Sequence, residues 1–181
     1  MRARPAGNRG PGDAMPELRL RDTSGDAHIL GNDGEHATLV VWTCNHCPYA
    51  LAWHDRLAAV ADEYRDRGVR TLMVNSNDAE RYPADSLEQM RDRVEREGWT
   101  VPYLHDPDQQ AAQAWAAQVT PHVYVLGSGG ELAYEGAPDD DHADPDAGAR
   151  WVRDALDAVL GGQAPDPALT EPVGCSVKWK P

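Results

Sequence analysis

The stretch "VVWTCNHCPYA", residues 40–50, places two cysteines where an apolar run ends and a helical pattern begins. The run starts earlier, as "ATLVVWT" (37–43), and its continuous β-branched and apolar character is typical of a strand buried on both faces. From Pro48 apolar residues recur at three- and four-residue steps as far as Arg67, and Gly68 follows as a stop signal. The sequence therefore predicts a strand, a turn carrying Cys44 and Cys47, and a helix.

This position affects the chemistry of the two sulfurs. The free N–H groups and the positive dipole end of a helix stabilise a thiolate, which is the nucleophile in disulfide exchange. We therefore expect Cys44 to be the reactive thiolate and Cys47, more buried and one turn further on, to resolve a mixed disulfide. A protonated His46 would stabilise the thiolate further and make the disulfide more oxidising.

The same dithiol admits two other interpretations. Cys44 and Cys47 could be inert buried thiols, or they could form a metal-binding or metal-delivery module together with His46. No cysteine or histidine elsewhere stands at zinc-finger or zinc-ribbon spacing, so we expect no metal and no cofactor. A C-x-x-C pair between a strand and a helix favours redox chemistry.

The remaining patterns alternate between strand and helix. We expect strands at 17–22, 28–30, 69–75 and 101–104, and an antiparallel hairpin at 123–127 and 131–136. Helices are expected at 85–98, at 106–118 and after Asp144-Pro145. Asp85 would open the first of these helices with Glu88 in a capping box, and Asp106 would cap the second. This order predicts an α/β protein with a mixed sheet.

Composition limits the class of protein. A chain of 181 residues suits one domain. Its 30 acidic residues against 17 basic ones, a net charge of −13, argue against nucleic-acid and anionic-membrane partners. No apolar run is long enough for a membrane span. Three cysteines are too few for a secreted disulfide scaffold and no secretory signal is recognisable, so we expect a cytoplasmic protein.

Five segments in the expected order resemble the thioredoxin superfamily, and more narrowly its CxxC-containing redoxin group, often labelled AhpC/TSA. They are "WTCNHCPYA" (42–50), "VNSNDAERYPADS" (74–86), "VPYLHDPDQQAAQAWAAQVTPHVYVLG" (101–127), "ELAYEGAPDDD" (131–141) and "GCSVKWKP" (174–181). The resemblance implies a thioredoxin-like fold: a central mixed β-sheet flanked by helices, with an N-terminal strand pair and an extended C-terminal tail. The Gly, Pro and Arg content of residues 1–14 predicts a disordered leader. The resemblance implies a thioredoxin-like domain over 15–162 and a tail packing on that domain over 163–181.

The resemblance also implies site residues and an activity. Pro121 would be a cis-proline beside the dithiol, the backbone of Thr120 would dock the substrate chain, and Trp42 would contact the substrate. The implied activity is thiol–disulfide exchange with a disulfide-containing protein or a small thiol, in which an unidentified partner supplies the electrons. The alternative is a thiol-dependent peroxidase with Cys44 as the peroxidatic thiol, although no Pro-x-x-x-Thr-x-x-Cys loop precedes that residue.

Cys175 has three open interpretations. It is a buried small apolar residue, a third redox thiol that pairs with Cys44 or Cys47 when the tail folds back, or a cross-link to a partner. The acidic stretch 139–146 lacks the spacing of a calcium loop, so we expect a solvated loop. We expect His54 to be a surface or capped residue.

Overall fold

A computed structural model describes residues 9–31, 33–34 and 37–181. In the described residues the main sheet has seven strands in the order β2-β1-β5-β4-β3-β7-β8. All the expected strands form, and their bounds are β1 Leu18–Asp22, β2 Ala27–Leu30, β3 Ala37–Trp42, β4 Val69–Asn75, β5 Tyr103–His105, β7 His122–Gly127 and β8 Leu132–Gly136.

The sheet is mixed, as predicted. Strands β3, β4 and β5 run parallel, whereas β7 pairs antiparallel with both β3 and β8. The other edge carries the N-terminal strand pair, in which β1 and β2 are antiparallel. Strand β3, which leads into the dithiol, is therefore central and is covered by hydrogen bonds on both sides.

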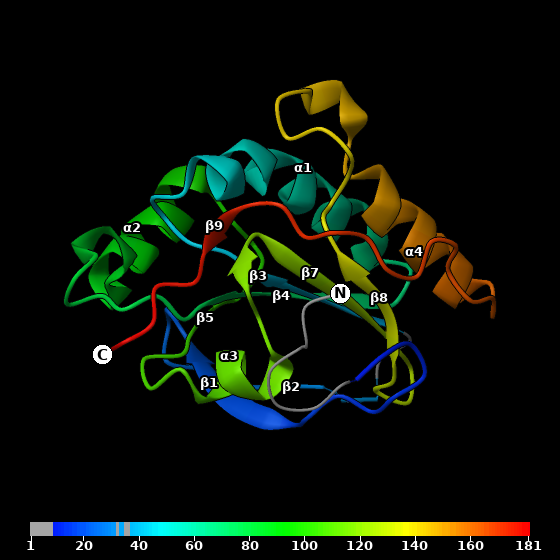
Figure 1. Cartoon of the computed structure of the whole chain (residues 1–181), viewed down its shortest axis with the longest axis horizontal. Coiled ribbons are helices and arrows are strands. Elements are labelled where there is room, and N and C mark those ends of the chain that lie inside the picture. Colours follow the sequence, from blue (N-terminus) through cyan, green and yellow to red (C-terminus); the bar gives the residue numbers. More distant parts are fainter. Residues whose placement is uncertain (1–8, 32, 35–36) are drawn as a thin grey trace.

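Helices cover both faces of this sheet. Figure 1 shows α1, α2 and α4 on one side and α3 on the other, and their bounds are α1 Pro48–Arg65, α2 Leu87–Glu97, α3 Gln110–Trp115 and α4 Arg150–Leu160. Successive side chains of β3 point to opposite faces of the sheet and so pack in two separate cores. Val41 packs in the core that contains Trp53 of α1, and Val40 packs in the core that contains Trp115 of α3. No helix in the described part of the chain is long and apolar enough to span a bilayer.

Two helices begin later than their expected caps. Asp85 ends a short 3₁₀ helix (η1, Pro83–Asp85), and Ser86 caps α2 by accepting the amide of Gln89. A second 3₁₀ helix (η2, Pro145–Ala147) precedes α4. The carboxylate of Asp106 accepts amides of the first turn of α3, but this helix starts only at Gln110, because Gln109 adopts a left-handed backbone conformation. The prediction that Asp85 caps this helix was therefore wrong, and its carboxylate accepts hydrogen bonds from other residues.

The N-terminal segment joins the domain earlier than expected. Residues 1–8 of the predicted leader lie outside the described residues. Gly12 donates its amide to Leu132, and Leu132 donates to Asp13, so residues 12 and 13 are paired with the start of β8. This pairing satisfies polar backbone groups at a sheet edge, so residues 12 and 13 belong to the domain and not to the expected leader.

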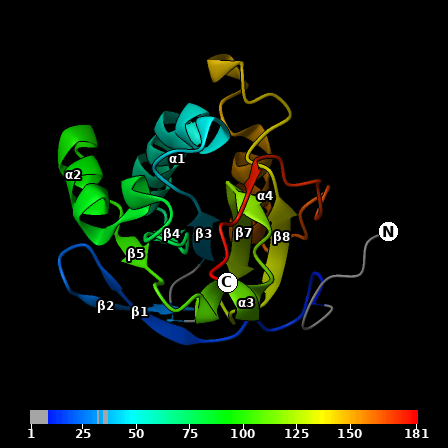
Figure 2. The same cartoon turned by 60° about the vertical axis from the view of Figure 1, so that its left-hand side comes forward.

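The C-terminal tail packs on the domain. It returns from α4 and pairs its strand β9 (Cys175–Ser176) antiparallel with β6 (Val119–Thr120) (Figures 1 and 2). On the way it hydrogen-bonds β8 through Glu135, which receives the amide of Thr170 and donates its own amide to Ala168. The tail is therefore a structural part of the fold, and its strand β9 lies beside the segment that leads into Pro121.

The acidic loop after β8 is anchored rather than wholly solvated. The Asp139 carboxylate is buried and lies 2.9 Å from the guanidinium of Arg56 on α1. It also accepts the indole N–H of Trp53 and the amide of Ala149. The expectation of a solvated loop was wrong at this residue, because a buried carboxylate needs donors and α1 supplies them.

Candidate active site

The dithiol lies in the turn between β3 and α1, where the sequence places it. Cys47 is the N-cap residue of α1, and its amide donates to the sulfur of Cys44 over 3.3 Å. Both cysteines are 0% exposed, so the expectation that Cys47 is the more buried of the two was wrong. Each sulfur is covered by protein because Thr120 and the C-terminal tail close over the turn.

Thr120 touches both sulfurs. Its hydroxyl oxygen lies 3.3 Å from the Cys44 sulfur, and its carbonyl oxygen accepts the Cys47 thiol at 3.3 Å. The Thr120–Pro121 peptide bond is cis, as the resemblance implies. The edge of β6 expected to dock a substrate is filled here by the chain's own tail, since Thr120 is the register partner of Cys175.

A buried carboxylate, Asp85, organises the dithiol turn from the other side. One of its oxygens accepts the amide of Asn45 at 2.7 Å and the side chain of Asn75 at 3.0 Å. The other accepts His46 Nδ1 at 2.5 Å and the side chain of Asn77 at 3.0 Å. Four donors on one fully buried carboxylate fix the two residues between the cysteines.

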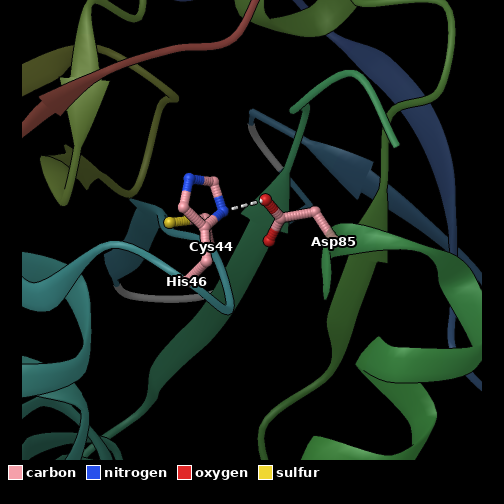
Figure 3. A group of neighbouring side chains, drawn as sticks. All are labelled: Cys44, His46 and Asp85. Atoms are coloured by element: carbon pink, nitrogen blue, oxygen red, sulfur yellow. Dashed lines mark hydrogen bonds and ion pairs between the residues drawn. The ribbon is translucent and has the colours of Figure 1, made fainter. Parts of the chain in front are cut away.

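The intervening residues point in defined directions. Figure 3 shows the His46 ring facing the Asp85 carboxylate, with the Cys44 sulfur beside the ring. The ring is also stacked on Tyr82, with centroids 5.3 Å apart. Asn45 points into the protein, where its side chain donates to the Ala84 carbonyl and accepts the Tyr103 hydroxyl. The turn is thus held by contacts on both sides of the motif.

The two thiols titrate as a pair. The hydrogen bond to Cys47, followed by burial and the charge of Asp85, raises the pKa of Cys44, whereas the Thr120 hydroxyl and the Cys47 amide lower it. The same sulfur–sulfur hydrogen bond is the largest of the causes that lower the pKa of Cys47 to about 4; hydrogen bonds from Cys175 and Ala50 act in the same direction, against burial. The first proton therefore leaves the pair readily and the second is retained. The expectation that Cys44 is the thiolate is corrected: in the reduced pair the shared hydrogen bond keeps the proton on Cys44 and favours the charge on Cys47.

Cys175 is the third member of this sulfur cluster. It packs against Cys44 and Cys47, and both its thiol and its amide hydrogen-bond the Cys47 sulfur. Unlike the other two cysteines it is only partly buried. Burial and then Cys47 raise its pKa to about 11, while Lys178 lowers it.

Two residues differ from their expected places. The Trp42 side chain lies in the α3-side core, where its ring contacts Trp115 and its indole N–H donates to Ser76, so the prediction that it contacts substrate was wrong. His54 is buried against Trp99 and hydrogen-bonds the Thr43 hydroxyl at 2.8 Å, so it is no surface residue. Burial, with a contribution from Arg93, lowers the pKa of His54 to about 3.

The site also contains a set of metal-ligating groups. Ligand atoms of Cys44, His46 and Asp85 all lie within 4.8 Å of one another. This set differs from the one considered from the sequence, because Asp85 takes the place of Cys47. Asp85 was missed as a site residue because its pattern with Glu88 predicts a helix cap, whereas α2 begins at Leu87 with Ser86 as its cap.

Comparison with known proteins agrees with this geometry. The family model described as Redoxin matches residues 10–150, which is most of the chain. The chain belongs to the Redoxin family. Among solved structures, an uncharacterized conserved protein from Geobacillus kaustophilus shares 35% identity with this redoxin, covering 94% of this chain and 93% of that one, with a TM-score of 0.87.

Two further structures extend the comparison. A hypothetical protein from Sinorhizobium meliloti 1021 shares 30% identity with this redoxin, covering 96% of this chain and 97% of that one, with a TM-score of 0.89. The thioredoxin domain of a thiol-disulfide oxidoreductase from Bacteroides vulgatus shares 15% identity, covering 70% of this chain and 87% of that one, with a TM-score of 0.57. That likeness shows the fold, which is thioredoxin-like. No curated protein matches the sequence.

Proposed function

We propose that this redoxin catalyses thiol–disulfide exchange through the Cys44–Cys47 dithiol. The observation that carries the proposal is the contact between the two sulfurs at the start of α1, with Thr120 touching both. A pair that gives up one proton readily keeps a thiolate available for attack on a disulfide. The substrate is a disulfide-containing protein or a small disulfide.

Cys44 is the sulfur proposed to attack. When its proton passes to Cys47 across the sulfur–sulfur hydrogen bond, the Cys44 thiolate keeps two donors, the Cys47 amide and the Thr120 hydroxyl. Attack on a substrate disulfide forms a mixed disulfide with Cys44 and releases one substrate sulfur as a thiolate. His46, held by Asp85, places a ring nitrogen within 4.8 Å of the Cys44 sulfur.

Cys47 is proposed to resolve the mixed disulfide. Amides of Ala50 and Cys175 hydrogen-bond its sulfur, and these bonds favour its thiolate once Cys44 is occupied. Attack by Cys47 on the Cys44 sulfur forms the internal disulfide and releases the second substrate sulfur. The substrate leaves with two electrons and the protein keeps one disulfide, so the exchange balances.

The test uses oxidised glutathione and variants that keep a single cysteine. The double variant Cys47→Ser/Cys175→Ser keeps only Cys44 and should accumulate a stable glutathione adduct on it, measured by intact-protein mass spectrometry. The matched control Cys44→Ser/Cys175→Ser keeps only Cys47 and should form the adduct more slowly. The Cys175→Ser variant should release glutathione and form the Cys44–Cys47 disulfide.

Two results would count against exchange. The proposal fails if Cys44 and Cys47 do not join in the folded Cys175→Ser variant. It also fails if hydrogen peroxide oxidises Cys44 rapidly and stoichiometrically while glutathione disulfide reacts sluggishly, because that pattern belongs to a peroxidase.

Metal binding is the second candidate, and the clustering of Cys44, His46 and Asp85 favours it. These soft and borderline ligands suit zinc or copper better than calcium or magnesium. Metal analysis of freshly purified protein, together with thiol titration, separates the two candidates. Near-stoichiometric metal that protects Cys44 from alkylation supports the metal site, whereas freely alkylated thiols support exchange.

A further inference from the structure

The two sulfurs of the proposed exchange reaction are closed off from solvent. Cys44 and Cys47 are 0% exposed, and the tail that covers them carries the partly buried Cys175. Exchange requires an attacking thiol to reach a disulfide sulfur, so access limits the rate as much as ionisation does. Among the three cysteines of this cluster in the described structure, Cys175 on β9 is therefore the one with surface open to outside thiols.

Cys47 lies between the other two cysteines in the hydrogen-bond pattern. Its sulfur bonds the thiol of Cys44 on one side and the thiol and amide of Cys175 on the other. The register of β9 on β6 fixes this arrangement, because Cys175 is paired with Thr120, whose carbonyl oxygen is 3.3 Å from the Cys47 sulfur. Cys47 is therefore placed to form a disulfide with either Cys44 or Cys175, and one disulfide can convert into the other.

We propose that Cys175 is the entry thiol of a three-cysteine relay, in which the disulfide moves between Cys44–Cys47 and Cys47–Cys175 and outside thiols react at Cys175. The relay rests on the exchange proposed above and assigns it a route for electrons. Its partner class is a small thiol or an exposed protein thiol, because the reacting sulfur is presented on a surface strand.

The relay step balances without an added oxidant. The Cys175 thiolate attacks the Cys47 sulfur of the Cys44–Cys47 disulfide, the Cys47–Cys175 bond forms and the Cys44–Cys47 bond breaks. The electron pair of the broken bond leaves on Cys44, which takes up a proton equivalent to the one that Cys175 lost. An outside thiol then attacks Cys175, forms a mixed disulfide with it and releases Cys47 as a thiolate, which takes up a proton. A second outside thiol attacks that mixed disulfide, so two outside thiols leave as one disulfide and the protein keeps three thiols.

The surroundings of Cys175 favour this order. In the reduced protein the hydrogen bond and charge of Cys47 contribute to raising the pKa of Cys175, and both influences disappear when Cys47 is part of a disulfide. Lys178 remains and favours the thiolate. Cys175 therefore ionises more easily when the dithiol is oxidised, which is when the relay needs it.

The decisive experiment is disulfide mapping of the full chain after oxidation with diamide, acid quenching and alkylation. The Cys44→Ser variant keeps Cys47 and Cys175 and should form an intramolecular disulfide between them. The matched control Cys47→Ser removes the central sulfur, and its two remaining cysteines should form no such bond. Wild-type protein should contain both the Cys44–Cys47 and the Cys47–Cys175 disulfides, a result that does not depend on any variant folding.

A rate measurement tests the direction of electron flow. Oxidised Cys175→Ser protein should be reduced by glutathione about tenfold or more slowly than oxidised wild type, because its disulfide is buried. An equal rate overturns the relay. Two results together also overturn the relay: both cysteines of the oxidised Cys44→Ser variant remain open to alkylation, and the wild-type map contains the Cys44–Cys47 disulfide alone. If neither the wild type nor the Cys175→Ser variant forms Cys44–Cys47 with diamide, the exchange proposal fails. If both form it and are reduced at equal rates, only the relay fails, so the two failures are distinguishable.

Discussion

A single carboxylate determines the shape of the dithiol turn. Asp85 binds the backbone of Asn45 and the ring of His46, which are the two residues between the cysteines. Its negative charge also raises the pKa of Cys44. The same group therefore positions the turn and opposes ionisation of the sulfur beside it, so its removal should affect redox potential and stability in separate ways.

Replacing Asp85 with Asn should make the disulfide more oxidising. Loss of the charge lowers the pKa of Cys44, which stabilises the reduced form, and one pKa unit corresponds to roughly 30 mV. The reduction potential, measured against a glutathione buffer, should become less negative. Urea denaturation should show a loss of about 1–3 kcal/mol, because an amide cannot accept all four hydrogen bonds.

The control for Asp85 is Glu88→Gln, which removes an exposed carboxylate on the first turn of α2. Its potential and stability should match those of the wild type. An unchanged potential in Asp85→Asn would show that the carboxylate positions the turn without influencing the sulfur.

Because His54 is buried, the free energy of unfolding should be smaller in mild acid than at neutral pH. Its pKa is about 3 in the folded state and near 6.5 in the unfolded chain, so between these values the unfolded state binds the extra proton. Stability is complete above about pH 6.5 and decreases as the pH falls, by up to about 1.4 kcal/mol per pH unit. Urea denaturation at about pH 7 and about pH 5 should show a smaller difference in His54→Gln than in wild type. Equal differences would contradict a buried neutral imidazole.

Among the elements, the loop after β8 depends on helix α1. The Arg56–Asp139 pair that joins them is buried, with side chains 6% and 0% exposed. The same carboxylate binds Trp53 of α1 and the amide of Ala149, the residue before α4. One buried ion pair therefore links α1, the loop and α4 on the same side of the sheet.

Substituting Arg56 with Met should destabilise the fold by about 3–5 kcal/mol in urea denaturation, because it leaves a buried carboxylate without its counter-charge. The double variant Arg56→Met/Asp139→Asn should recover part of the loss, since it removes the unpaired charge and its single amide oxygen still accepts one of the two donors, Trp53 or Ala149. Arg150→Ala is the control: it breaks an exposed pair with Asp140 and should cost less than about 1 kcal/mol. Equal losses in Arg56→Met and Arg150→Ala would refute the role of the buried pair.

The molecule as a whole closes its site with its own C-terminus. Strand β9 fills the edge of β6 beside the cis-proline, and Gly174 makes this approach possible. A Cβ added at Gly174 would lie 2.0 Å from the Thr120 carbonyl oxygen and 2.6 Å from its carbon. Both are backbone atoms of a packed segment, so the tail would have to move away.

Gly174→Ala should therefore detach β9. We expect a loss of about 1–3 kcal/mol in urea denaturation and faster alkylation of Cys47 and Cys175 in the reduced protein. In the Cys44→Ser background it should also weaken formation of the Cys47–Cys175 disulfide. Gly10→Ala, at a position with no atom within 4 Å of the added carbon, is the control and should behave like the wild type. Unchanged alkylation in Gly174→Ala would show that the tail does not shield the dithiol.

The sequence by itself determined the local elements: the buried run of β3, the periodicity of α1 and the turn that places Cys44 and Cys47 between them. These follow from side-chain pattern and helix-end chemistry over short stretches of chain. Resemblance to a family added the cis bond at Pro121 and the tail that packs on the domain. The tertiary structure decided the partners of the two sulfurs, because Asp85 and Cys175 reach the turn only after the sheet is assembled and the tail folds back. Hydrogen bonds between distant segments depend on which edges and faces meet, and no short stretch of sequence contains that information.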